Sequence, residues 1–328
     1  MTTQPDFDRF LLQGTASPEE NGEAYAGEFS FSAFKASLYS FCRRAWYFHY
    51  LFAQGGWNSF ADEFRRQAYK EKFLVSFSSF LSFVVQESLR KSLPEIREEK
   101  TSEREKALLE AMKVHASRLL FLAGSFLREG GMEKDPRKLA FYDLCYPTGK
   151  FENYEDLLEC AVSRLRQFFH VFPESGFFRL LAGISSPCWR YGEDFPSFSL
   201  EGVSVFLSPC LYALSGGVLH SFRVFFHAPG KGEEESFADR IFALYAAGRY
   251  PGHKGKVNVL FFPEKEAFAE ERSFFPTPAD KEEILAKAEE ILNALRTPVM
   301  ENFPCTQEKE KCVSCRFKGI CGRMGEGD

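Results

Sequence analysis

Three cysteines near the end of the chain are the residues whose types and spacing most clearly suggest chemistry. Cys312, Cys315 and Cys321 form the pattern C-x2-C-x5-C. Thiolates bind soft metals, and a C-x2-C pair lets two sulfurs reach one metal centre. The pattern therefore predicts zinc or an iron–sulfur cluster, and the spacing alone favours neither strongly.

A four-thiolate site needs one more cysteine, and the chain offers two candidates. Cys305 precedes Cys312 by only seven residues, whereas Cys42 lies far upstream. A ribbon-type zinc site usually has a second C-x2-C pair, which this chain lacks, while a single remote cysteine is compatible with a 4Fe–4S cluster. If Cys42 is the fourth ligand, the two ends of the chain meet at one metal centre.

The cellular setting also favours metal over disulfides. The first residues are polar, and no uncharged apolar run reaches the ~18 residues that a membrane span needs. The nine cysteines therefore indicate a reducing, cytoplasmic compartment, where clustered cysteines more often bind metal. We expect a cytoplasmic protein without a membrane partner.

The charge pattern is locally basic on an acidic protein. The formal net charge of −5 does not predict general nucleic-acid binding, but local charge matters more. Basic residues follow Cys42 and surround the C-terminal cysteines, namely Arg43, Arg44, Lys309, Lys311, Arg316, Lys318 and Arg323. If the two segments meet, these residues form one basic patch. The 38 phenylalanines are expected mainly in the core, and an exposed subset would form a partner-binding surface.

The elements that must position the cysteines change in character along the chain. Residues 1–29 are polar, acidic and rich in glycine, which predicts a flexible tail. Apolar residues then recur at helical spacing over 32–50, 60–93, 102–128 and 154–172, with Ser32 as the first N-cap and Cys42 in mid-helix.

The second half shows strand character. Strands are predicted over 198–207, 211–214, 218–227 and 256–262, with helices over 237–250 and 277–296. We therefore expect a mixed α/β domain over 30–323. Its parts are a helical region (30–175), a small sheet with an inserted helix (196–264), a further helix (277–297) and the cysteine segment (303–323).

The two cysteine segments resemble the iron–sulfur staple of RecB-type PD-(D/E)XK nucleases. That group includes the AddB subunit of bacterial double-strand-break repair and the CRISPR adaptation nucleases. Its members join one cysteine on an aromatic-rich N-terminal helix to a C-terminal C-x2-C-x5-C. The matching residues here are Tyr39, Cys42, Trp46, Tyr47 and Tyr50, followed by Cys312, Cys315 and Cys321. The resemblance implies a restriction-endonuclease-like core and a 4Fe–4S cluster. Its four ligands would be Cys42, Cys312, Cys315 and Cys321, and Cys305 would be spare.

The family's catalytic residues are replaced at each matched position. The family places an Asp on one strand, and an acid and a Lys two residues apart on the next. This chain has Cys210, Ser221 and Arg223 there, Ile241 in place of a helical Gln, and Ser82 in place of a helical His. A thiol and a hydroxyl do not replace two carboxylates at a Mg²⁺ site. The resemblance therefore implies a nuclease fold whose catalytic site is inactive and without Mg²⁺.

Other acids near these strands leave an active site as an alternative. Glu193, Asp194 and Glu201 precede Cys210, and Glu233, Glu234, Glu235 and Asp239 follow the second strand. We interpret them as solvated loop charges. His220 as a base and Cys210 as a nucleophile lack suitably spaced partners, so buried packing is the better interpretation of both.

Three functional hypotheses follow. The first is a DNA-binding or scaffolding subunit that works with a helicase or another nuclease-system protein in repair, recombination, CRISPR or a mobile element. Its DNA contacts would come from Arg43, Arg44, Arg223, Arg316, Lys318 and Arg323. The second is an active Mg²⁺- or Mn²⁺-dependent exonuclease with atypical acids. The third is a protein-interaction subunit that binds no nucleic acid.

Trp46, Tyr47 and Tyr50 could stack on bases, but core packing is the favoured interpretation. No phosphate-binding loop motif occurs, so a helicase motor would belong to another subunit.

Overall fold

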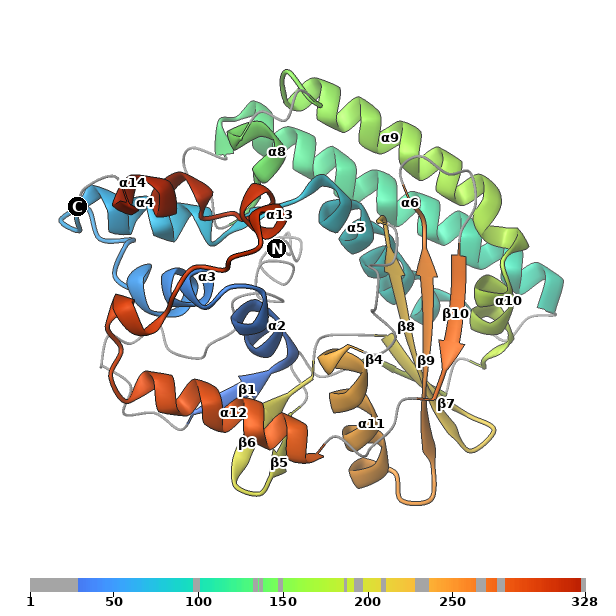
Figure 1. Cartoon of the computed structure of the whole chain (residues 1–328). Coiled ribbons are helices and arrows are strands. Elements are labelled where there is room, and N and C mark those ends of the chain that lie inside the picture. Colours follow the sequence, from blue (N-terminus) through green and yellow to red (C-terminus); the bar gives the residue numbers. More distant parts are fainter. Residues whose placement is uncertain are drawn as a thin grey trace.

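A mixed five-stranded sheet divides the molecule into two packed layers (Figure 1). The computed structural model describes residues 29–96, 101–131, 135, 138–146, 150–185, 188–191, 197–207, 211–227, 236–263, 270–275 and 281–325. The predicted tail therefore lies almost entirely outside the described residues.

The strands form three sheets. The large sheet has the order β10-β9-β8-β7-β4, the second has β1-β6-β5, and β2 pairs with β3. The strands are β1 (Ser30–Ser32), β2 (Leu74–Val75), β3 (Ala140–Phe141), β4 (Trp189–Tyr191), β5 (Ser197–Leu200), β6 (Val203–Phe206), β7 (Leu211–Ser215), β8 (Val218–Phe225), β9 (Lys254–Phe261) and β10 (Glu270–Phe274).

Most of the remaining described residues are helical. The α-helices are α2 (Ala33–Phe41), α3 (Arg43–Tyr47), α4 (Glu63–Glu71), α5 (Phe77–Ser92), α6 (Thr101–Arg128), α8 (Tyr142–Cys145), α9 (Tyr154–Val171), α10 (Gly176–Gly183), α11 (Phe237–Arg249), α12 (Lys281–Leu295), α13 (Lys309–Val313) and α14 (Lys318–Gly325). A π-helix, η1 (Phe48–Phe52), and three 3₁₀ turns, η2 (Leu93–Glu95), η3 (Phe172–Glu174) and η6 (Met300–Asn302), connect them. No described helix is long and apolar enough to cross a bilayer.

The chain order of the large sheet is a meander followed by a crossover. β7 runs antiparallel to both β4 and β8, and α11 then carries the chain to β9, which lies parallel to β8. A parallel pair requires such a crossover helix. The fold is therefore mixed α/β, as the sequence predicts.

Each face of the large sheet has its own core. One face packs against α5, α6, α9 and α10, and the other packs against α11, α2, α12 and the second sheet. Alternate residues of β8 divide between the two, with Phe222 and Val224 in the first core and Leu219 in the second. Most described phenylalanines are buried, which confirms the core as their main location.

Besides the helix expected over 32–50, which is broken at Cys42, two predicted elements are divided in the structure. The expected helix over 60–93 consists of α4, the short strand β2 and α5, whose new start is capped by Ser76. The expected strand over 198–207 is a hairpin of β5 and β6. Its turn places Glu201 at φ 49° and Gly202 at φ 87°, values that a continuous strand does not contain. The prediction of Ser32 as an N-cap is confirmed, since its hydroxyl accepts from the Lys35 N–H.

Candidate metal centre

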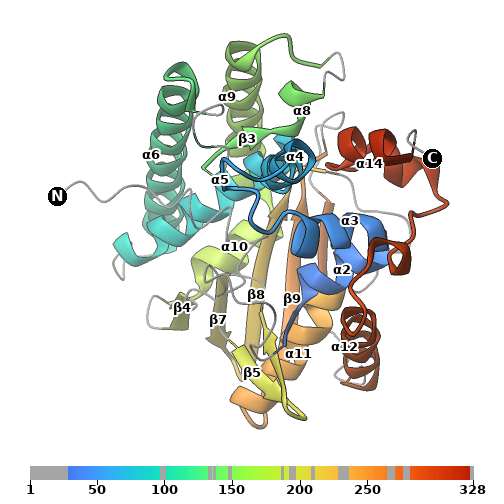
Figure 2. The ribbon, with the colours of Figure 1, turned by 90° about the vertical axis from the view of Figure 1, so that its left-hand side faces the viewer.

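The C-terminal segment packs against the first helices of the chain. Phe303 stacks on Trp46, with ring centroids 5.7 Å apart and ring planes 5° apart. Arg44 donates from its side chain to the Phe303 carbonyl at 2.7 Å and from its backbone to the Pro304 carbonyl at 3.2 Å. Figures 1 and 2 show α14 (red) beside α4 (blue). The buried Trp46 confirms core packing for this side chain.

Cys42 lies between α2 and α3, which corrects the expected mid-helix position. Its backbone is extended, with φ −164° and ψ 119°. Its N–H donates to the Leu38 carbonyl, and its carbonyl accepts from the Trp46 N–H, both at 3.0 Å. Both helices therefore fix the residue, and its side chain is buried.

The three C-terminal cysteines lie within and between the short helices α13 and α14. Cys312 lies exposed in α13, Cys315 lies half-buried in the turn, and Cys321 lies half-buried in α14. Phe317, immediately before α14, and Ile320, within α14, are fully buried. They anchor this segment in a small core that contains the buried Cys42 and contacts Cys315 and Cys321.

Residues 303–325 pack against residues 33–71, and this contact is called the junction. The thiols of the junction influence one another. Burial is the main cause that raises the pKa of Cys315 to about 11, and the neighbouring Cys42 and Cys312 also raise it. Burial likewise raises the pKa of Cys321 to about 12, with further contributions from Cys305 and Cys315. The metal-free thiols of Cys315 and Cys321 are therefore held protonated, and a metal would have to displace those two protons on binding.

Cys305 lies closest to Cys321, with 3.4 Å between the two sulfur atoms. Among the described residues, no group of three or more His, Cys, Asp or Glu side chains stands close enough to hold a metal ion. The thiols of Cys42, Cys312, Cys315 and Cys321 are the groups that would hold a metal. Their soft sulfur chemistry fits a thiolate-bound metal group, and in an iron–sulfur cluster each thiolate would bind a different iron atom.

The face of β8 that points towards α11 carries two of the family-matched positions. Ser221 is buried, and its hydroxyl has no hydrogen-bond partner among the described residues. Arg223 forms an ion pair with Asp239 of α11, and the other Asp239 oxygen accepts from the Ser236 N–H at 3.0 Å and hydroxyl at 2.7 Å. The expectation that Asp239 is a solvated loop charge is wrong, because its carboxylate is buried and paired.

The other matched positions are also structural. Ser82 of α5 donates to the Ser78 carbonyl at 2.8 Å and accepts from the Phe226 N–H at 3.0 Å, so it joins α5 to the end of β8. Ile241 of α11 is fully buried in the core. Cys210 lies outside the described residues, as do Glu193, Asp194, Glu233, Glu234 and Glu235. Glu201 forms an exposed ion pair with Lys281.

His220 lies on the opposite face of β8. It is buried, and burial first and then the neighbouring Lys256 hold its pKa below the ordinary value. Its Nδ1 lies 3.4 Å from Asn258 Nδ2, and Asn258 in turn donates to the Ser221 carbonyl at 3.0 Å. This neutral network favours a packing role.

The described cations predicted to bind DNA all have internal contacts. Arg43 pairs with Glu290 at 2.5 Å, and Arg44 and Arg223 have the contacts given above. Arg316 donates to the Lys72 carbonyl at 2.8 Å, and Lys318 lies over the rings of Tyr142 and Tyr146. The side chain of Arg323 lies outside the described residues. Arg44, Arg316 and Lys318 therefore join the C-terminal segment to the rest of the chain. Arg43 joins α3 to α12, and Arg223 joins β8 to α11.

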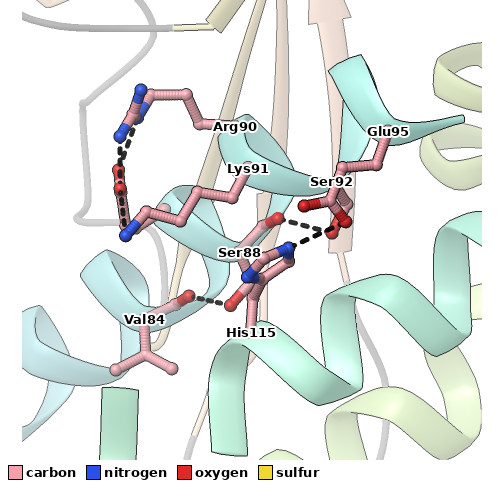
Figure 3. A network of polar contacts seen from close by, with 8 residues as sticks. Val84, Ser88, Arg90, Lys91, Ser92, Glu95 and His115 are labelled. Atoms are coloured by element: carbon pink, nitrogen blue, oxygen red, sulfur yellow. Dashed lines mark hydrogen bonds and ion pairs between the residues drawn. The ribbon is translucent and has the colours of Figure 1, made fainter. Parts of the chain in front are cut away.

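A serine–histidine–glutamate grouping lies between α5 and α6 (Figure 3). His115 Nε2 lies 3.1 Å from Glu95 Oε2. The hydroxyls of Ser88 and Ser92 donate to the carbonyls of Val84 and Ser88 at 2.6 and 2.7 Å, and both serines are fully buried. A nucleophile needs an accessible hydroxyl paired with a base, whereas these hydroxyls bond carbonyls of their own helix and the His115–Glu95 contact links α6 to η2.

A groove of about 850 Å³ between α6 and α9 is a feature that the sequence analysis missed. Apolar side chains line it, including Phe121, which is 67% exposed. The charged residues of its lining are all basic, namely Lys113, Arg128 and Arg166. The apolar run over 119–122, wider than one helix face, is the sequence signal that could have found it.

Comparisons with family models, curated proteins and solved structures found no match for this chain.

Proposed function

We propose that this chain is a non-cleaving module with a PD-(D/E)XK nuclease fold and a cysteine-bound iron–sulfur staple. It would act as a DNA-binding or scaffolding subunit beside a helicase or another nuclease-system protein. Repair, recombination, CRISPR adaptation and mobile-element systems all use such assemblies. The fold part of this proposal is supported by the antiparallel β4-β7-β8 meander, the α11 crossover to the parallel β9, and the packing of α5 on β8.

The observation that carries the proposal is the ion pair between Arg223 and Asp239. Mg²⁺ requires carboxylate oxygens, and the matched strand position holds the neutral Ser221. The Asp239 carboxylate beside this position is already neutralised by a guanidinium. A second cation would have to displace Arg223 and bind with little compensating charge, so the face favours structure over metal-dependent cleavage.

A nuclease assay tests this proposal directly. The purified chain is incubated with Mg²⁺ or Mn²⁺ and end-labelled single- and double-stranded DNA, and we expect no cleavage above an EDTA control. Cleavage that EDTA abolishes and that Asp239→Asn also abolishes would overturn the inactive-site proposal. Binding is measured in parallel, and salt-dependent retention of DNA supports the nucleic-acid role because phosphate contacts release counterions.

The groove between α6 and α9 favours a second candidate, a docking surface for a partner protein. Its exposed apolar floor and exclusively cationic charged lining complement an acidic amphipathic helix, which binds such grooves through apolar residues at i, i+3, i+4 and i+7. Exposed apolar patches of this kind mark interaction sites. We therefore propose an acidic helix of a partner subunit as the occupant.

A synthetic helix with leucine at those spacings and glutamate elsewhere is the probe. Phe121→Asp is expected to weaken its binding at least about tenfold, or 1.4 kcal/mol. Val114→Asp places the same charge at another exposed apolar position of α6, outside the groove, and should leave binding unchanged. Equal affinities of the two variants would exclude the groove as the binding surface.

A further inference from the structure

We infer that Cys305 and Cys321 are a redox-active thiol pair, which a low-molecular-weight disulfide oxidises to an intramolecular disulfide when the chain holds no metal. The 3.4 Å between their sulfur atoms is the observation that carries this inference. A disulfide bond measures about 2.05 Å, so small rotations of the two side chains must bring the sulfurs together.

Independent contacts hold the two cysteines in place. Cys305 follows Phe303 and Pro304, whose carbonyls accept hydrogen bonds from Arg44. Cys321 lies in α14, and its N–H donates to the carbonyl of the fully buried Phe317 at 2.9 Å. Because both backbones are fixed before oxidation, the pair is pre-positioned for closure.

Accessibility assigns the order of the two steps. Cys305 is exposed and Cys321 is half-buried, so an oxidant in solution reaches Cys305 first. The Cys305 thiolate attacks one sulfur of glutathione disulfide and releases one glutathione. The Cys321 sulfur then attacks the mixed disulfide as its proton leaves, and a second glutathione is released. Two protein thiols and one glutathione disulfide give one protein disulfide and two glutathione thiols.

The pair gives the otherwise spare Cys305 a role. Oxidation would withdraw Cys321 from the metal-binding thiols and leave Cys312 and Cys315 alone on this segment. The oxidised chain should therefore take up no iron until it is reduced, a consequence that rests on the proposed iron–sulfur staple. The formation of the disulfide itself does not depend on that proposal.

Mass spectrometry of the full chain tests the pairing. The metal-free protein is incubated with glutathione disulfide, free thiols are alkylated, and the chain is digested with trypsin without reduction. Trypsin places Cys305 in peptide 297–309, Cys312 and Cys315 together in 312–316, and Cys321 in 319–323. We expect a crosslink between 297–309 and 319–323. A crosslink of 312–316 to either peptide as the main product, or no crosslink at all, would overturn the inference.

Iron reconstitution separates this inference from the proposed staple. The oxidised wild-type chain is expected to bind at least fivefold less iron than the reduced chain, and Cys305→Ser should bind the same amount before and after oxidant treatment. If the crosslink forms but neither state binds iron, the staple fails while the thiol pair stands. If oxidised wild type binds iron as well as reduced wild type, the thiol pair does not control loading.

Discussion

The junction and the α11-facing side of β8 differ in what their chemically reactive side chains do. At the junction, Cys42, Cys315 and Cys321 pack in one small core with Phe317 and Ile320, and Cys305 lies beside Cys321. On β8, the positions compared with the nuclease acid and lysine carry a buried hydroxyl and a guanidinium paired to Asp239. One region offers thiol donors for a soft metal, while the other packs in the core. This difference is what the proposed non-cleaving module with a nuclease-like fold would require.

Removing a thiol from the junction is the change with the largest expected effect. Cys42→Ser should lose most of the iron of an anaerobic preparation, together with much of its stability, because metal-binding energy contributes to folding energy. Absorbance and iron analysis of the purified chain check this result. Cys145→Ser, at an exposed cysteine of α8, is the matched control and should keep its iron. Iron loss in Cys305→Ser but not in Cys42→Ser would show that Cys305 is the fourth ligand.

Breaking the ion pair on β8 should have the next largest effect. Arg223→Met leaves the Asp239 carboxylate buried without its partner, which typically costs about 3–5 kcal/mol of unfolding free energy. The double variant Arg223→Met/Asp239→Leu should recover most of this loss, because no uncompensated charge remains. Urea denaturation measures both. An Arg223→Met loss no larger than that of Lys113→Met, which breaks an exposed pair with Glu110 and costs under about 1 kcal/mol, would show that the β8 pair is not structural.

Two glycines of α14 test how closely this helix packs at the junction. A Cβ added at Gly319 would stand 2.5 Å from the Tyr146 hydroxyl and 3.0 Å from Glu71 Oε1, whereas one at Gly322 meets nothing within 4 Å. Gly319→Ala is therefore expected to cost about 1–3 kcal/mol through overpacking. Gly322→Ala should stabilise the chain by up to about 1 kcal/mol, since alanine favours helix. Equal effects in thermal unfolding would mean that α14 does not pack as closely as described.

Local sequence signals predicted the elements that depend on neighbouring residues. The helices near 102–128 and 154–172 have clear apolar periodicity, and they agree with α6 and α9 to within a residue at each end. Ser32 is a cap in the structure because its partner, the Lys35 N–H, lies three residues away. Such contacts are encoded within one helical turn.

Long-range contacts explain what the sequence could not provide. β1 pairs with β6, about 170 residues later, and three residues of alternating pattern give no sign of that partner. Asp239 is interpreted from the sequence as a solvated loop charge because its partner, Arg223, lies on β8, a separate element that the local sequence around Asp239 does not reveal. The break at Cys42 likewise depends on packing, since the apolar spacing continues through it. For the candidate site, spacing indicated the C-terminal cysteines and left Cys42 and Cys305 as alternatives for a fourth ligand, and only the family resemblance favoured Cys42 over Cys305.

His220 offers the smallest test, on the face of β8 opposite Arg223. Because burial and Lys256 hold its pKa below the ordinary value, the folded chain keeps this imidazole neutral where the unfolded chain binds a proton. Its contribution to stability is therefore present above the unfolded pKa of about 6.5 and is lost as pH falls through the lower folded value. Between pH 8 and 5, wild type should lose stability more steeply than His220→Gln, by less than about 1.4 kcal/mol per pH unit. Parallel curves in urea denaturation at each pH would mean that His220 is as readily protonated in the folded chain as in the unfolded one, and that this face of β8 is more open to water than its burial indicates.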